Sequence, residues 1–501
     1  MSPQRPQRPS SPARRGPSRP RGRAGNAGRR RHEAVDEPAQ RGPAEEIILA
    51  VGAPAHGGHC VARPADDPTG RVVFVRHALP GETVRAAMTE KNAKIWRADA
   101  VEILTPSPDR VDSVWPQAGP GGVGGGELAH VALPAQRTWK RWVLADCLRR
   151  IGGPATAQAV AALEEAGSSG SIVVEPLASE AAAEASGQAR EARLAGTGTR
   201  TRVSLTVGPD GRPGMHGFRS GTVQPLDRLP LAVAAIEEIG LLESSRWRKH
   251  YRPGMRVEAV APSIGEPLVL LDDRVLTSQA HATGRRRVEE AVDASGLGLG
   301  ELRYSLHAEG FWQIHRDAPV TLVDRVVRAA LGQEPSAAGT GGDGAKALGG
   351  ARGKRVMELY SGAGLFTLPL AMLIDGGELC AIEGSSQAVG DARRNLHGLG
   401  SVRLSTGRVT ARSVTQAGQA MGKAPDVVVL DPPRQGAGRE VIGALAGLAP
   451  ERIVLVACDP AALARDLAVL LDNRYELAAM SALDMFPHTH HFETIAVLER
   501  R

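Results

Sequence analysis

The sequence predicts an α/β protein with a small all-β barrel near its N-terminus and a doubly wound parallel sheet near its C-terminus. Between residues 45 and 105, short apolar runs alternate with polar residues and turns, which is typical of a barrel of about five strands. From Lys354 onward, short apolar strands alternate with helical segments, which favours a parallel sheet covered by helices. At 501 residues the chain also exceeds a single typical core, so we expect two to four domains.

The barrel is expected over residues 44–106. It follows a tail, residues 1–43, that is rich in Arg, Pro, Ser and Gly and should be disordered. Turn residues separate the apolar runs that we expect to form the barrel strands. Those runs are Glu46–Val51, Gly70–Val75, Thr83–Ala86 and Ala98–Leu104.

Residues 107–300 form a central region, and within it residues 170–300 have the pattern that is hardest to interpret. Gln136–Ile151 predicts a helix that ends at a Gly-Gly pair. Ala178–Gly198 predicts a surface helix or a linker, and Thr201–Val207, followed by Gly-Pro-Asp-Gly, predicts the first strand of a hairpin. A further linker, rich in Gly and Ala, is expected at Pro335–Gly353.

The C-terminal region, residues 301–501, contains the strands of the predicted parallel sheet. Helical segments separate the first five strands, as in a doubly wound sheet. No helix separates the last two strands, so these should form an antiparallel edge. The expected strands are Arg355–Leu359, Glu378–Ile382, Val402–Ser405, Asp426–Leu430, Arg452–Ala457, Tyr475–Leu483 and Thr494–Leu498.

Positive charge is concentrated at the N-terminus. The chain has a formal net charge of +6, and residues 1–31 contain ten arginines and no acidic residue, which leaves −4 (6 minus 10) for the rest. Such a tail either attracts phosphates or is a solvated extension without a specific role. No apolar run reaches the ~18 residues of a transmembrane helix, and no stretch resembles a signal peptide. We therefore expect a cytoplasmic monomer with no membrane partner.

Three polar side chains stand at the ends of apolar strands in the C-terminal region. Asp431 and Cys458 directly follow strands, and Glu493 directly precedes one. In an open parallel sheet, the carboxyl ends of the strands line the crevice where ligands bind. A thiol and two acids at that edge suit covalent chemistry on a base. No pair among the four cysteines has C-x-x-C spacing, so we expect neither a zinc site nor a disulfide framework.

A glycine-rich turn and an acid predict a nucleoside site beside these residues. Glu358–Gly364 (ELYSGAG) follows the first strand of the sheet, and Glu383 stands at the end of the next strand. An acid in that place accepts hydrogen bonds from ribose hydroxyls. The turn has neither a third glycine nor a phosphate-binding lysine. This favours an adenosine ligand without a pyrophosphate, such as S-adenosylmethionine.

These segments, in this order, resemble the TRAM-domain RNA uracil-5-methyltransferases, which methylate carbon 5 of uridine in tRNA or ribosomal RNA. The resemblance extends over about residues 45–150 and 300–501, and less clearly over 200–230. The segments that carry it are Glu358–Leu370 (ELYSGAGLFTLPL), Asp431–Ala437 (DPPRQGA), Cys458–Asp466 (CDPAALARD), Asp484–Glu493 (DMFPHTHHFE), the aromatic-x-Gln segment Phe311–His315 (FWQIH) and the barrel segment Gly57–Glu82.

The resemblance implies a fold, a reaction and the residues that carry it. The fold is a Rossmann-like class I methyltransferase domain with an N-terminal OB-like TRAM barrel and a central RNA-binding insertion. The reaction transfers a methyl group from S-adenosylmethionine to carbon 5 of a uridine in tRNA or rRNA through a covalent cysteine adduct. Cys458 is then the nucleophile and Glu493 the base. The residues that contact S-adenosylmethionine are Gln313, Tyr360, Glu383 and Asp431.

One departure from the family concerns metal. Many members bind an iron–sulfur cluster through four cysteines, three of them in a C-x5–7-C-G-G-C segment. In the corresponding segment, Arg110–His130, the cysteine positions hold Trp115, Val123 and Gly126, so we expect no cluster. The histidines within residues 488–491 lack an acidic or thiol complement, so we expect no other metal site either. Two milder departures are a serine at 361 for a frequent cysteine and an aspartate at 459 for a frequent asparagine.

Two alternatives stay open. The same thiol chemistry serves RNA cytosine-5 methyltransferases, and a TRAM barrel also occurs in RNA-binding proteins without catalysis. Intact Cys458, Glu493 and Asp431 argue against a catalytically silent protein. Arg434 stands where methyltransferases that act on planar nitrogen have an aromatic residue, which weighs against methylation of an exocyclic amine. The sequence does not specify which RNA or which uridine is the target.

Overall fold

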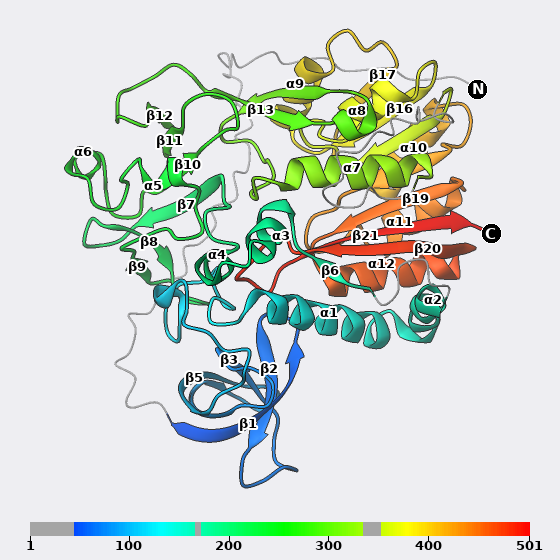
Figure 1. Cartoon of the computed structure of the whole chain (residues 1–501). Helices are drawn as coiled ribbons and strands as arrows, with labels where there is room; N and C mark the ends of the chain where they lie inside the picture. The colour runs from blue at the N-terminus through cyan, green and yellow to red at the C-terminus, as the bar shows by residue number, and fades with distance from the viewer. Residues whose placement is uncertain (1–44, 166–171, 334–351) are drawn as a thin grey trace, which may run out of the picture. The chain divides into compact units, whose positions relative to one another are not determined.

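A computed structural model of the chain describes residues 45–165, 172–333 and 352–501 (Figure 1). The arginine-rich tail predicted for residues 1–43 and most of the linker predicted for Pro335–Gly353 lie outside these ranges. None of the helices in the described ranges combines the length and the apolar character needed to cross a bilayer.

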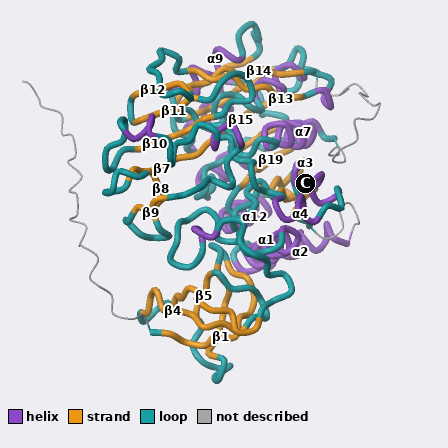
Figure 2. Tube along the Cα trace, turned by 60° about the vertical axis from the view of Figure 1, so that its left-hand side comes forward, coloured by secondary structure: helices purple, strands orange, loops and turns teal. Residues whose placement is uncertain are grey.

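The first five strands form a closed barrel in the order β1-β2-β3-β5-β4, visible at the bottom of Figures 1 and 2. Strand β1 pairs with both β2 and β4, so the barrel has no free edge. Leu49 of β1 and Val84 of β4 are fully buried in its core. The predicted five-stranded barrel is confirmed; the sequence analysis had marked four of its strands and missed β2. The strands are β1 Glu46–Ala55, β2 His59–Pro64, β3 Val73–Arg76, β4 Thr83–Lys91 and β5 Trp96–Thr105.

The central region contains several helices and an antiparallel sheet, of which only the first strand was predicted from the sequence. The sheet has six strands in the order β12-β11-β10-β7-β8-β9. The predicted hairpin is present, since β7 pairs with β8 across the Gly-Pro-Asp-Gly turn. The strands are β7 Arg202–Val207, β8 Pro213–His216, β9 Val223–Pro225, β10 Arg256–Val260, β11 Leu268–Leu271 and β12 Arg274–Thr277.

The helix predicted at Gln136–Ile151 is confirmed as α1, Leu133–Arg150. The segment predicted as one helix or a linker at Ala178–Gly198 forms two short helices instead, because Gly187 adopts a left-handed φ of 70° between them. The helices and short 3-10 turns of the central region are η1 Pro116–Ala118, α1, α2 Gly153–Glu165, α3 Ala178–Ala185, α4 Ala189–Leu194, α5 Ala234–Glu237, α6 Ser245–Arg248 and η2 Ser295–Leu297.

The C-terminal region forms the predicted doubly wound sheet, with eight strands in the order β17-β16-β15-β18-β19-β21-β20-β6. Strands β15 to β19 are parallel, and β21 is antiparallel to both of its neighbours. The strands are β15 Arg355–Leu359, β16 Glu378–Glu383, β17 Val402–Thr406, β18 Val427–Leu430, β19 Arg452–Ala457, β20 Tyr475–Leu483 and β21 Glu493–Arg500.

The predicted antiparallel edge is only half right. The last two strands pair antiparallel, but β21 lies inside the sheet, and β6 (Val174–Glu175) from the central region adds a parallel strand beyond β20. The hairpin of β13 (Arg287–Asp293) and β14 (Glu301–His307) also spans the boundary proposed between residues 300 and 301. The central and C-terminal regions therefore share structure across that boundary.

Alternate residues of the buried strands face two separate apolar cores. In β19, Ile453 and Leu455 face one core, and Val454 and Val456 face the other. Helices α10, α11 and α12, with α1 and α2, cover the first face, and α7, α8 and α9 cover the second (Figure 1). These helices are α7 Ala318–Leu331, α8 Thr367–Leu373, α9 Ser386–Asn395, α10 Ala411–Ala420, α11 Arg439–Gly447 and α12 Pro460–Asp472.

Candidate active site

The register of the sheet brings a thiol and two carboxyl groups to one edge. Ala457 at the end of β19 lies opposite Thr494 of β21. The next residues outward, Cys458 and Glu493, therefore face each other across the same pair of strands. Asp431 follows β18, which is the other neighbour of β19. The three residues that sequence analysis selected at strand ends thus lie around one point.

Burial and mutual repulsion set the protonation of this group. Burial, together with the nearby carboxylates of Glu493 and Asp431, raises the pKa of the Cys458 thiol to about 12, while the charge of Arg434 acts to lower it. Burial raises the pKa of Asp431 to about 7. Burial and the charge of Asp431 together raise the pKa of Glu493 well above its ordinary value. Each negative charge opposes the ionisation of the other, so both carboxyl groups give up their protons less readily than exposed acids do.

Glu493 has the features of a group placed to exchange a proton. Its side chain is 6% exposed, and its Oε1 atom has no hydrogen-bond partner among the described residues. A buried carboxyl oxygen without a partner is costly, and such groups concentrate at functional sites. Its raised pKa makes the carboxylate a stronger base than an exposed glutamate.

The segment that follows the Asp-Pro-Pro-Arg turn is held in place by an aspartate of α12. Asp466 of α12 accepts backbone hydrogen bonds from Ala437 at 2.8 Å and Gly438 at 3.1 Å. Gly436 adopts a φ of 83°, and a Cβ atom at this position would approach Asp466 Oδ2 to 2.8 Å. Glycine is therefore required there by both conformation and space. These contacts fix the chain just after Arg434, whose charge acts to lower the pKa of the Cys458 thiol.

The helix that follows the thiol begins at an aspartate with two roles. Asp459 caps α12 by accepting a hydrogen bond from the Ala462 N–H at 2.8 Å. Its other carboxylate oxygen lies 2.9 Å from Nε2 of His56, in the turn between β1 and β2 of the barrel. The barrel thereby contacts the residue next to Cys458, although 403 positions separate the two partners.

This contact predicts a pH-dependent contribution to stability. The hydrogen bond to Asp459 raises the pKa of His56 above 6.5, and burial only partly opposes it. The stabilisation should be complete below pH ~6.5 and disappear as the pH rises through the raised pKa of folded His56. Because His56 is half-exposed, we expect His56→Ala to cost less than about 1 kcal/mol near pH 6 and nothing near pH 9. Heat unfolding at both pH values checks this, and an equal loss at both would contradict it.

The glycine-rich turn after β15 forms a backbone concavity. Tyr360, Gly362 and Gly364 all have positive φ values, of 64°, 56° and 93°. A Cβ atom on Gly362 would meet no atom within 4 Å, so the space above the turn is open. A left-handed φ at a non-glycine residue such as Tyr360 is unusual and is typical of functional sites. The turn thus has room for a ligand against its backbone.

Acidic groups surround this turn. Glu383 at the end of β16 accepts hydrogen bonds from the backbone of Gly362 at 3.0 Å and Ser385 at 2.7 Å. Each of its oxygens keeps a lone pair that can accept a further hydroxyl. Burial raises the pKa of Glu358 to about 8, and its Oε2 atom and the Ser361 hydroxyl have no partner among the described residues. Unsatisfied buried polar atoms beside an open concavity fit a polar ligand that completes the set.

The aromatic-x-Gln segment is connected to the same turn by two rings in contact. Trp312 packs on Tyr304 of β14, with ring centroids 5.1 Å apart. The Tyr304 hydroxyl donates to the carbonyl of Leu365, just after the glycine-rich turn, at 3.0 Å. Gln313 follows Trp312 directly and is 9% exposed. These contacts fix the segment that carries Gln313 against the turn.

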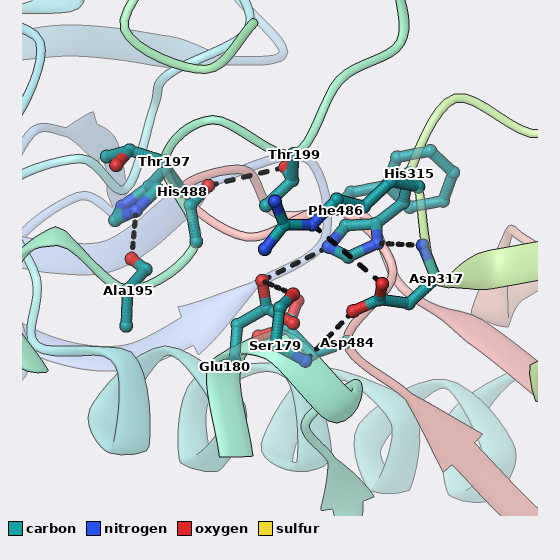
Figure 3. Close-up of polar contacts among 12 residues, drawn as sticks. Ser179, Glu180, Ala195, Thr197, Thr199, His315, Asp317, Asp484, Phe486 and His488 are labelled. Carbon is teal, nitrogen blue, oxygen red and sulfur yellow. Dashed lines mark hydrogen bonds and ion pairs between the residues drawn. The ribbon is translucent and has the colours of Figure 1, made fainter. Parts of the chain in front are cut away.

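A histidine and two acids next to Gln313 have the spacing of a metal site, but their hydrogen bonds already occupy them (Figure 3). The Asp317 N–H donates to His315 Nδ1 at 3.1 Å, so the ring proton resides on Nε2, which lies 3.1 Å from Glu180. The Ser179 N–H donates to Asp317 at 2.9 Å. Neither ring nitrogen of His315 is then free to bind a metal. The cluster instead anchors the start of α3 to the segment that precedes α7.

Two polar residues of α1 hold the histidine-rich loop that leads to Glu493. Gln136 accepts a hydrogen bond from the His488 N–H at 2.7 Å, and its amide donates to Nδ1 of that residue's ring at 3.2 Å. The fully buried Lys140 contacts the carboxylate of Asp484 and the carbonyl of Phe486. Sequence analysis missed both residues, because a Gln and a Lys four positions apart on a helix give no sign of partners 352 and 344 positions away.

The segment Arg110–His130, which was expected to lack the ligands of an iron–sulfur cluster, contributes to an apolar core. Trp115 and Val123 are buried in one apolar core with residues of the antiparallel sheet. A Cβ atom on Gly126 would lie 2.8 Å from the Trp115 ring, so the ring occupies the space beside this glycine. The cysteines lie apart, in β2, in α1, in β16 and at the end of β19. These side chains do not fit an iron–sulfur cluster, because its ligands are normally thiolates.

Protein purified without oxygen should therefore be colourless and contain no stoichiometric iron or sulfide. The expectation follows because residues 110–130 contain no cysteine and the Trp115 ring fills the space beside Gly126. Iron and sulfide assays, with an absorption spectrum around ~400 nm where cluster transitions fall, check it. Stoichiometric iron with such a band would contradict it.

The chain is similar to known RNA methyltransferases. The family described as tRNA (Uracil-5-)-methyltransferase matches residues 345–501. An uncharacterized RNA methyltransferase of Streptomyces coelicolor is 36% identical, over 93% of this chain and 95% of the relative. The 23S rRNA (uracil(1939)-C(5))-methyltransferase RlmD of Alkalilimnicola ehrlichii is 30% identical, over 92% of this chain and 98% of the relative.

Among solved structures, the fold is similar to that of the Pyrococcus abyssi tRNA (uracil-54, C5)-methyltransferase in complex with S-adenosyl-L-homocysteine. The TM-score is 0.57 at 20% sequence identity, and the match covers 90% of this chain and 99% of the other. At this identity the likeness concerns the fold. The α/β architecture predicted from sequence is confirmed.

Proposed function

The chain belongs to the family of RNA (uracil-5-)-methyltransferases, and on that basis we propose that it transfers a methyl group from S-adenosylmethionine to carbon 5 of a uridine in tRNA or ribosomal RNA. The observation that carries the proposal is the placement of Cys458 opposite Glu493, with Asp431 beside them, at the edge of the sheet where ligands bind. Methylation of carbon 5 requires a thiol that adds to the uracil ring and a base that removes a proton from it. Cys458 and Glu493 can provide these two groups.

We propose the following roles for these residues. Carbon 5 of uracil is a poor nucleophile, and addition of the Cys458 thiolate at carbon 6 converts the ring to an enolate whose carbon 5 can take the methyl group. Glu493 then removes the proton from carbon 5, and elimination frees the thiol. Arg434 carries the charge that favours the thiolate over the thiol. The target base must leave its stack to reach this site.

S-adenosylmethionine supplies an electrophilic methyl group on a sulfonium centre. The concavity at the glycine-rich turn fits it, since open space lies above Gly362 and Glu383 can accept ribose hydroxyls. We propose that Gln313, Tyr360, Glu383 and Asp431 hold it. A positive charge next to Asp431 would favour the ionised form of this carboxyl, which opposes the effect of burial on its pKa.

Nucleoside analysis tests the function directly. Total RNA from cells that lack this gene is incubated with the purified protein and S-adenosylmethionine, then digested and examined by mass spectrometry. We expect a gain of 5-methyluridine with the wild-type protein and none with Cys458→Ala. A gain of 5-methylcytidine would instead support the cytosine-5 alternative, and no methylated nucleoside would support a silent RNA-binding protein.

Two further statements belong to the proposal. The protein should act in the cytoplasm as a monomer, and its RNA contacts should include the barrel of residues 44–106 and the central region of residues 107–300. Size-exclusion chromatography with light scattering checks the monomer, and a species of twice the 52.6 kDa chain mass would contradict it.

A further inference from the structure

We propose that a groove between the barrel and helix α1 binds the single-stranded RNA that flanks the target uridine. This deepens the proposed function and rests on it. The groove has a volume of about 890 Å³ and lies where strands β1, β2 and β3 approach α1; Figures 1 and 2 both show α1 directly above the barrel. It is lined by Ala53, Pro54, Ala55, Val61, Arg63, Val72 and Phe74 of the barrel and by Arg141, Trp142, Ala145, Asp146, Arg149 and Arg150 of α1.

Aromatic rings lie on both walls of this groove. Trp142 of α1 is 57% exposed, although the opposite face of the same helix, including Val143 and Leu144, is buried. Phe74 of the barrel lines the other wall and is half-buried. Aromatic residues make up only 3% of the chain, so an exposed tryptophan is notable. Solvent-exposed rings in a groove are the surfaces on which single-stranded bases stack.

The groove is also strongly basic. It contains four arginines, Arg63, Arg141, Arg149 and Arg150, against one acid, Asp146. Asp146 pairs with Arg149 at 3.3 Å and with Arg150 at 2.6 Å, but one carboxylate cannot neutralise two guanidinium groups. Surface pairs of this kind are also weak and readily exchanged for phosphate. Closely spaced arginines complement the negative charge of an RNA backbone.

One wall of the groove continues into the turn that contacts the residue next to the thiol. Ala53, Pro54 and Ala55 line it and belong to the end of β1, directly before the turn that carries His56. His56 in turn contacts Asp459, the residue that follows Cys458. A strand that occupies the groove therefore lies beside the segment of the barrel that contacts the catalytic helix.

The chemistry of the groove favours a single strand over a duplex. Stacking on Trp142 and Phe74 requires unpaired bases, whereas the bases of an A-form duplex are enclosed in the stack. The small side chains of Ala53, Ala55 and Ala145 leave space between the two walls. A target base that must be turned out of its stack also comes from a locally unpaired segment.

Paired substitutions test this assignment. The probe is a fluorescein-labelled 12-nucleotide oligouridylate, whose dissociation constant is measured by anisotropy across a salt series. Trp142→Ala should weaken binding about 5- to 150-fold without changing the salt slope, because one stacked base is lost and no charge is removed. Trp142→Phe should retain most of the affinity. The double variant Arg149→Gln/Arg150→Gln should weaken binding and make the salt slope shallower by about 1.4, because each phosphate contact to a single strand contributes about 0.7.

The chain offers a matched control for charge. Arg393 and Arg394 end helix α9 as Arg149 and Arg150 end α1, and both are exposed, but they do not line the groove. Arg393→Gln/Arg394→Gln removes the same charge and should leave both the affinity and the salt slope close to wild type. Equal effects of the two double variants would overturn the proposal, since the charge would then act without regard to place. An unchanged affinity in Trp142→Ala would do the same.

The outcome is distinguishable from failure of the proposed function. If the wild-type protein forms 5-methyluridine while the groove variants bind the probe as tightly as the wild type does, the proposed RNA site is wrong and the proposed function stands. If the groove variants lose binding of the probe but the wild-type protein methylates no uridine, the proposed RNA site stands and the proposed reaction is wrong. Because the substituted side chains are exposed, circular dichroism should show normal folding in every variant.

Discussion

Replacement of Cys458 with alanine should abolish methyl transfer to RNA while S-adenosylmethionine binding remains nearly unchanged. The thiol faces Glu493 at the edge of the sheet, whereas the open concavity for the cofactor lies at the turn after β15. Loss of a covalent nucleophile typically lowers the rate by ~10³-fold or more. Single-turnover methylation assays measure the first effect, and isothermal titration with S-adenosylmethionine measures the second.

Trapping of the covalent intermediate separates a nucleophile from a merely structural thiol. With RNA that contains 5-fluorouridine, the wild-type protein should form an adduct that survives denaturation, because fluorine does not leave as a proton does. Cys458→Ala should form none. The matched control is Cys380→Ala, which removes a buried thiol from β16 of the same sheet and should still give the adduct. Active methylation without any trapped adduct would remove Cys458 from the mechanism.

The sequence was sufficient to predict the gathering of Asp431, Cys458 and Glu493. Asp431 and Cys458 follow continuous apolar strands, and the carboxyl ends of parallel strands share one edge, whereas Glu493 begins the antiparallel strand beside β19. The same rule located the glycine-rich turn and Glu383. These elements depend on local patterns, which are visible in a single sequence.

Contacts between distant segments were not predictable in this way. Strand β6 has two residues, which is too short for any periodicity, and its place beyond β20 depends on pairing with a partner some 300 positions away. The contact of His56 with Asp459 and the support of the histidine-rich loop by Gln136 arise only when the regions pack together. The sequence likewise shows that the cysteines of an iron–sulfur cluster are missing. It does not show that the Trp115 ring packs against Gly126.

Replacement of Glu493 with glutamine should separate bond formation from release. Glutamine has nearly the same shape as glutamate but cannot take the carbon 5 proton, so the methylated base should stay attached to Cys458. We expect turnover to fall by about 10²- to 10⁴-fold, the usual contribution of a general base. Protein–RNA adducts should accumulate with ordinary, unfluorinated RNA, and denaturing gels with labelled RNA detect them.

Electrostatics sharpen this expectation. The carboxylate of Glu493 raises the pKa of the Cys458 thiol, so its replacement with a neutral amide lowers that pKa and favours the thiolate. Adduct formation should therefore proceed at least as fast as in the wild type, while release alone is slowed.

Asp431→Asn is the matched comparison, because it also removes a negative charge near the thiol but leaves the base in place. It should slow methyl transfer without accumulating a methylated adduct. Wild-type turnover in Glu493→Gln would show that this carboxyl is structural, and equal adduct accumulation in Asp431→Asn would show that charge, and not proton removal, controls release.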